Sequence, residues 1–143
     1  MAIERMRLQV PEVVGKARPR VTTRNGRAMA YTPAKTRRFE ALVSRAWREQ
    51  ATEDRSGFRG PVVVTVEVWR ELARTNPKCW RDRPDLGKPD LDNVAKAVLD
   101  ALNGVAYADD SQVVSFVAIK HPRLPYGDGC WVSVEIHYVE EEK

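Results

Sequence analysis

Carboxylate side chains gather between residues 90 and 110 in a spacing suited to divalent-metal chemistry. Asp90 and Asp92 come two residues apart after Pro89, and the pair Asp109 and Asp110 follows further along the chain. Because proline disfavours helix at the residue before it, we expect the chain to arrive extended and to start a helix near Asp90. The positive end of a helix stabilises negative charge. Two ionised carboxylates at one turn can converge on a hard cation such as Mg²⁺.

Asp110 is separated from Asp90 by the predicted helix. Asp110 follows the far end of a helix that would be ~15–20 Å long, so it joins Asp90 only if the chain runs back along the helix or a second subunit contributes. Lys96 falls one turn after Asp92 on the same helical face. Each residue also has an ordinary alternative role: Asp90 as a helix N-cap, Lys96 in a salt bridge to Asp92 or Asp100, and the Asp-Asp pair as turn residues.

Basic residues are separated from this acidic region. From Lys16 to Arg38 there are eight basic residues and no acidic one. A segregated basic segment is typical of a phosphate-binding surface, and a solvated, charge-rich hairpin is the alternative. The residues that we predict to contact DNA are Lys16, Arg18, Arg20, Arg24, Arg27, Lys35, Arg37 and Arg38, with Lys78, Arg81, Arg83 and Lys88 from a later loop.

Length and composition predict one folded domain. The chain has 143 residues, of which 43% are hydrophobic and 31% charged, with a net charge of +4. No apolar run approaches the ~20 residues that cross a bilayer. The N-terminus lacks the apolar stretch of a signal peptide, so we expect a cytoplasmic protein without a membrane partner. Cys79 and Cys130 show no metal-ligand spacing and are expected to be free thiols.

Hydrophobic periodicity predicts an α+β fold, with two main helices packed on a small mixed β-sheet. Alternation indicates strands at residues 5–10, 62–69, 113–120 and 129–139, and Asn25-Gly26 indicates a hairpin turn. One helix is expected from Thr32, as N-cap, with Pro33 in its first turn, to about Gln50. The other runs over residues 90–102. Residues 71–89 are expected to form a long loop.

The motif set resembles a known family. The pattern Lys-Pro-Asp-x-Asp-Asn-x-x-Lys at residues 88–96, Leu-Asp-Ala-Leu-Asn-Gly at 99–104 and Asp-Asp-Ser-Gln-Val at 109–113 closely resembles the RusA family of Holliday junction resolvases. The likeness extends more loosely over nearly the whole chain, which implies a single RusA-like domain at residues 1–143. It implies a homodimer that binds four-way DNA junctions and nicks two strands symmetrically with Mg²⁺, for which Mn²⁺ can substitute.

The resemblance also assigns roles to residues. It places the metal-binding carboxylates on Asp90, Asp92 and Asp110, with Lys96 as a further catalytic residue, in a hydrolysis that leaves 5′-phosphate ends. The segment before the Asp-Asp pair is about a residue shorter than in the best-known member, so Asp109 is an alternative for the third position. A junction-binding module without activity, or a nuclease for other branched nucleic acids, are the competing interpretations.

Overall fold

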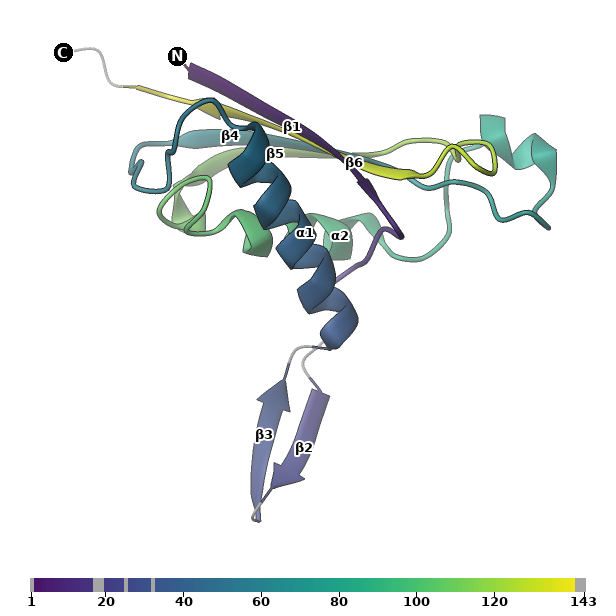
Figure 1. Cartoon of the computed structure of the whole chain (residues 1–143), viewed down its shortest axis with the longest axis horizontal. Helices are drawn as coiled ribbons and strands as arrows, with labels where there is room; N and C mark the ends of the chain where they lie inside the picture. The colour runs from purple at the N-terminus through teal and green to yellow at the C-terminus, as the bar shows by residue number, and fades with distance from the viewer. Residues whose placement is uncertain (1, 17–19, 25, 32, 141–143) are drawn as a thin grey trace.

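A computed structural model describes residues 2–16, 20–24, 26–31 and 33–140 (Figure 1). The elements in chain order are β1 (Ala2–Val10), β2 (Arg20–Arg24), β3 (Arg27–Tyr31), α1 (Ala34–Gln50), β4 (Val62–Trp69), the 3₁₀ turn η1 (Lys78–Asp82), α2 (Leu91–Leu102), the 3₁₀ turn η2 (Asp110–Gln112), β5 (Val113–Lys120) and β6 (Cys130–Tyr138). The α+β prediction is confirmed.

Four strands form a mixed sheet in the order β1-β6-β4-β5. The pairs β1·β6 and β4·β6 are antiparallel, whereas β4·β5 is parallel. A parallel pair needs a long crossover, and residues 70–112, which contain α2, provide it. The strand β5 therefore lies at an edge of the sheet, bonded to β4 alone among the described strands.

The core lies between one face of this sheet and the two helices. Along β4 the side chains alternate between buried and half-buried, and Val62, Val64, Val66 and Val68 have no exposed surface. The helices contribute regularly spaced apolar residues such as Phe39 in α1 and the fully buried Val98 in α2. Burying each valine contributes roughly 1.5–3 kcal/mol, so this alternation fixes which face of β4 meets the helices.

Two segments project from this core (Figure 1). The β2–β3 hairpin forms a separate two-stranded sheet that extends beyond the start of α1. The predicted hairpin is confirmed, and Gly26 has a φ of 77° that suits glycine, whereas Asn25 lies outside the described residues. At the far end of the molecule from the two termini lies the region that carries η1. We call this region, residues 71–87 and 121–129, the distal lobe.

The elements differ from the sequence predictions in three details. The first strand is longer, starting at Ala2, and the predicted loop contains η1. Pro33 is the N-cap of α1 rather than a residue of its first turn, because its ψ of 144° is extended and helical geometry begins at Ala34. The predicted cap Thr32 lies outside the described residues. Both cysteines are free, as expected, and no helix in the described ranges is long and apolar enough to cross a membrane.

Candidate functional site

Two carboxylates stand exposed at the start of α2. Asp90 occupies the N-cap position, but its side chain accepts no capping hydrogen bond. Both of its oxygens instead lie near Lys88 Nζ, at 3.0 and 3.1 Å. This ion pair is exposed and contributes little to stability. Asp92 follows in the first turn and is also exposed. The folded chain therefore leaves both carboxylates accessible at the positive end of a helix.

Lys96 is exposed on α2, one turn beyond Asp92. Among the described residues no salt bridge joins it to Asp92 or Asp100. Asp100 is engaged elsewhere, because its Oδ2 lies 3.0 Å from Lys16 Nζ. The alternative role of Lys96 as the partner of these two aspartates is thus absent from the structure, and its ammonium group remains accessible to a substrate.

Asp110 lies beyond the opposite end of α2. Its Oδ1 accepts a hydrogen bond of 3.0 Å from the hydroxyl of the buried Tyr107. Burial raises the pKa of the Asp110 carboxyl, and nearby Asp100 adds to this, so that the opposing effect of the Tyr107 hydrogen bond is outweighed. Asp110 is a neighbour of Asp100, which is eight residues after Asp92 on the helix, ~12 Å by helical rise. Asp110 is therefore remote from Asp90 and Asp92. Among described residues no three His, Cys, Asp or Glu side chains form a metal-binding group.

Asp109 has a structural role of its own. Its Oδ2 accepts a hydrogen bond from the Ser111 backbone N–H at 3.1 Å, and the Gln112 side chain accepts from the Asp109 N–H at 2.7 Å. These contacts form a capping box at the start of η2. The bonds from Ser111 hold the pKa of the Asp109 carboxyl below its usual range. Of the two adjacent aspartates, Asp109 is thus committed to the turn.

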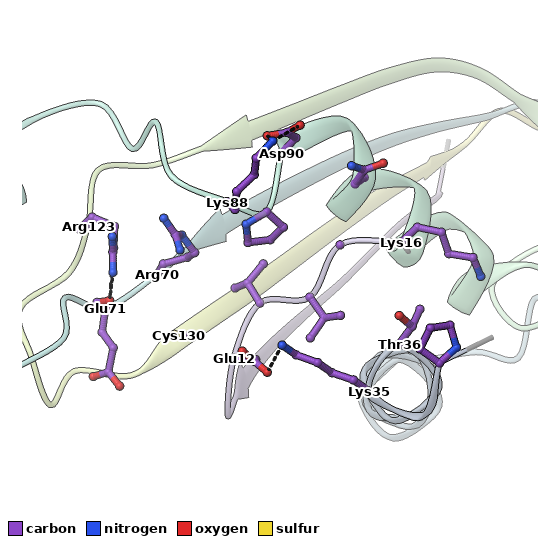
Figure 2. A pocket seen from close by; sticks show the side chains of 16 residues that line it. Glu12, Lys16, Lys35, Thr36, Arg70, Glu71, Lys88, Asp90, Arg123 and Cys130 are labelled. Atoms are coloured by element: carbon purple, nitrogen blue, oxygen red, sulfur yellow. Dashed lines mark hydrogen bonds and ion pairs between the residues drawn. The ribbon is translucent and has the colours of Figure 1, made fainter. Parts of the chain in front are cut away.

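A cavity of about 580 Å³ lies beside Asp90 (Figure 2). Five basic side chains line it: Lys16, Lys35, Arg70, Lys88 and Arg123. Three acidic ones, Glu12, Glu71 and Asp90, line it as well, and Lys16, Lys35, Arg70 and Lys88 each form an ion pair with a carboxylate. Figure 2 shows Lys88 and Asp90 side by side where α2 begins, with Arg123 directed at Glu71. The guanidinium of Arg123 donates to the Glu71 backbone carbonyl, which leaves its charge without a carboxylate partner in that contact.

The predicted DNA-contacting residues divide into three groups. Arg18 lies outside the described residues, and for Arg20 and Arg24 the structure places only the backbone, in β2. The side chains of Arg27, Arg37, Arg38, Lys78, Arg81 and Arg83 are exposed. Lys16, Lys35 and Lys88 are paired with acidic groups: Lys16 with Glu40 and Asp100, Lys35 with Glu12 at 2.8 Å, and Lys88 with Asp90.

Sequence reasoning missed several residues of this region. Arg70 and Asp85 form a two-bond ion pair of 2.7 and 2.6 Å across 15 residues of sequence. Lys120 Nζ donates to the backbone carbonyls of Gly87 and Pro89, and thereby holds the chain that leads into Asp90. The sequence offered one signal for these contacts, the position of Arg70 and Lys120 at the ends of neighbouring strands. Their partners lie in residues 85–89, a segment without hydrophobic periodicity.

The aromatic side chains on the face of the sheet opposite the helices pack against neighbouring side chains. Trp69 stacks on His121 with ring centroids 4.4 Å apart, and Arg7 lies over both Trp69 and Trp131. His121 also contacts Glu67 at 3.0 Å, and His137 contacts Glu135. In these contacts neither histidine touches a residue of α2.

Exposed carboxylates at a helix start, a lysine one turn on and an adjoining basic cavity are features of proteins that act on a phosphodiester backbone. The family model described as Endodeoxyribonuclease RusA matches residues 11–137, and the chain belongs to this family. RusA-family proteins are nucleases of Holliday junctions and generally depend on divalent metal. A Bacillus subtilis (strain 168) protein described as uncharacterized protein YqaN is 36% identical over 117 residues, which cover 76% of this chain and 81% of that protein.

Proposed function

We propose that this chain, acting as a homodimer of single-domain subunits, resolves four-way DNA junctions by paired, symmetric nicks. The reaction is a divalent-metal-dependent phosphodiester hydrolysis that leaves 5′-phosphate ends. The observation that carries the proposal is the exposed pair Asp90 and Asp92 at the start of α2, free of capping bonds, where Asp90 lines a cavity with five basic side chains. Carboxylate oxygens next to a phosphate-binding surface are the donors that Mg²⁺ uses in such sites.

The donor chemistry of Asp90 and Asp92 fits Mg²⁺ or Mn²⁺, since both are hard oxygen ligands that water can still reach. When bound there, the cation supplies a water of lowered pKa and offsets charge on the scissile phosphate. Lys96 is placed to stabilise negative charge on the phosphate as the bond breaks. Exposed basic residues at Arg37 and Arg38 on α1, and in the hairpin, hold the DNA arms through their phosphates.

The third carboxylate reaches this site from a partner subunit. The strand β5 is eight residues long and spans ~25 Å. Its last residue, Lys120, contacts Pro89, which directly precedes Asp90, and its first residue follows shortly after Asp110. If the free edges of two β5 strands pair antiparallel about a two-fold axis, the start of one strand lies beside the end of the other. The partner subunit's Asp110 then approaches Asp90 and Asp92.

The surface of β5 supports this pairing. An exposed edge strand with apolar side chains is a site for pairing with another chain unless charge or proline protects it. Val114, Val117 and Ile119 of β5 are all exposed, and the strand has no charged residue before Lys120. A two-fold pairing of this edge covers these residues and gives the two related active sites that symmetric nicking requires.

The test is cleavage of a labelled four-way junction in Mg²⁺ or EDTA, beside a linear duplex of equal length and with the Asp90→Asn variant. We expect paired nicks at symmetric positions with Mg²⁺ alone, no cutting of the duplex, and junction binding without cutting by the variant. Binding without cutting by the wild-type protein in both Mg²⁺ and Mn²⁺ overturns the proposal in favour of a binding module. Preference for flaps or forks over the junction overturns the assigned substrate.

A further inference from the structure

The distal lobe contains a second cavity, of about 350 Å³, that the proposed chemistry does not use. Its walls are mainly apolar and include Trp80 and Leu86, with Arg83 and Arg123 beside them. Leu86 is 93% exposed and Trp80 is 40% exposed. Unlike Trp69, Trp80 has no stacking partner in the described part of the chain. Holding large apolar side chains in water is unfavourable, and nothing in the fold of the described residues requires it here.

An ion pair with a buried carboxylate supports one wall of this cavity. Asp85 has a side chain only 2% exposed and binds Arg70 through both oxygens. Burial raises the pKa of the Asp85 carboxyl, but hydrogen bonds from Arg70 and the Gly87 N–H outweigh burial and leave the pKa below its usual range. A Cβ on Gly87 would meet the Arg70 guanidinium, so a side chain there would shift that group. Leu86 lies between Asp85 and Gly87, both of which contact Arg70 or the Asp85 carboxylate.

Charge at the cavity favours an anionic ligand with a flat apolar part. The single acidic lining residue, Asp85, is neutralised by Arg70. Arg123 donates to a backbone carbonyl and Arg83 is exposed, so in these contacts neither guanidinium is paired with a carboxylate. Aromatic and apolar walls with adjacent arginines are the features by which proteins bind unstacked bases of single strands, the base stacking and the phosphate pairing with the cations.

The cavity also adjoins the proposed active site. Arg123 lines both this cavity and the larger one beside Asp90. Gly87, in its wall, is three residues from Asp90, and Lys120 holds both Gly87 and Pro89 by their carbonyls. One DNA strand passing over Arg123 can therefore occupy both cavities with successive nucleotides.

We propose that the distal-lobe cavity takes one unstacked base of the DNA next to the cleaved phosphate, with Trp80 and Leu86 as its stacking surfaces. This inference rests on the proposed action on branched DNA, since bases are unstacked most readily where the duplex is interrupted. It predicts that the lobe distinguishes a junction from continuous duplex, a task separate from the chemistry at Asp90.

The test measures DNA binding in EDTA, so that cleavage does not enter. We expect Trp80→Ala to weaken junction binding roughly ten-fold, the usual value of one base–aromatic stack, and to leave duplex binding unchanged. Tyr126→Ala is the matched control, because Tyr126 is an aromatic residue of the same lobe, 63% exposed, that does not line the cavity. Leu86→Ser gives a second variant at a side chain too exposed to matter for folding.

A direct readout is photocrosslinking from 5-iodouracil placed at each position around the crossover. The inference expects a crosslink to Trp80 from one position of the junction and from none in the duplex. Equal loss of binding in the Trp80 and Tyr126 variants, or no loss in either, overturns it. Loss of dimer by Trp80→Ala with unchanged junction affinity per dimer overturns it in favour of a subunit contact. A wild-type protein that forms the crosslink but cuts nothing contradicts the proposed cleavage, and leaves standing only the binding of an unstacked junction base in this cavity.

Discussion

Among individual residues, the carboxylates differ in how much of their bonding capacity the fold already uses. Asp109 is bound to the start of η2 through its side chain and its backbone N–H. Asp110 accepts one bond from Tyr107 and has Asp100 as a like-charged neighbour. A site that gathers negative charge in this way is unfavourable until a cation offsets it. These differences support our proposal that Asp110, rather than Asp109, is the third metal ligand.

This difference predicts opposite results for two neighbouring substitutions. Asp110→Asn should lower the rate of junction nicking by roughly 100-fold or more, because a neutral amide is a poor ligand for a hard cation. Asp109→Asn keeps an oxygen that can cap η2 and should change the rate little. Single-turnover nicking with saturating protein measures both, and a melting temperature for each variant controls for folding. An inactive Asp109→Asn beside an active Asp110→Asn would reverse the assignment.

At the scale of elements, a buried carboxylate connects β1 to the end of α1. Glu4 is only 4% exposed, and its side chain accepts hydrogen bonds from the Thr52 N–H and hydroxyl and from the Glu53 N–H. Burial raises the pKa of the Glu4 carboxyl, but these bonds outweigh it and leave the pKa below its usual value. The unfolded chain therefore takes up a proton at Glu4 more readily than the folded one does.

We expect Glu4→Gln to lower the free energy of unfolding by roughly 1–3 kcal/mol at neutral pH, because it weakens part-buried hydrogen bonds from the Thr52 and Glu53 N–H groups. The wild-type advantage should shrink as pH falls below the ordinary glutamate pKa of 4.5, since protonating Glu4 removes the charge in both states. Urea unfolding at pH 7 and at about pH 3 measures both effects. Glu53→Gln, at an exposed neighbouring carboxylate, is the control and should change stability little. A difference that grows in acid would contradict the assigned sign.

The elements also show how far the sequence alone could lead. Alternation in β4 and β6 and the helical spacing in α2 follow from local burial patterns, so these elements were predictable. The motif likewise predicted Asp90 and Asp92 at a helix start. The pairing of Arg70 with Asp85 was not predictable, because it joins residues that only the tertiary fold brings together. The distance from Asp110 to Asp90 depended on the course of β5, which the sequence left open.

At the scale of the whole molecule, the two edges of the sheet differ in their protection. The edge strand β1 carries charged Glu4, Arg5 and Arg7, whereas β5 has apolar residues over most of its length. Charges on an edge strand oppose pairing with another chain. The proposed dimer therefore uses β5 and leaves β1 at the outside.

Two lysine substitutions of similarly exposed residues test this choice of edge. Val117 on β5 is 46% exposed and Ile3 on β1 is 43% exposed. Val117→Lys should convert the dimer to a monomer and abolish paired nicking, because two-fold pairing brings both new charges into one interface. Ile3→Lys should change neither property. Light scattering after size-exclusion chromatography measures the mass, and a dimer that survives Val117→Lys but not Ile3→Lys would move the interface to β1.

The proposed sharing of carboxylates between subunits makes a prediction that no single-subunit site can meet. We expect Asp90→Asn and Asp110→Asn proteins each to be inactive, whereas a heterodimer of the two would contain one site built from the intact Asp90 of one subunit and the intact Asp110 of its partner. Mixing and exchanging the two inactive proteins should therefore restore nicking at roughly a quarter of wild-type sites, in the form of single nicks. Asp90→Asn mixed with Asp92→Asn is the control and should stay inactive, because both changes fall on the same end of α2 and every site keeps one of them. Activity in neither mixture, with heterodimers demonstrated by mass, would place all three carboxylates in one subunit and require α2 and β5 to rearrange when DNA binds.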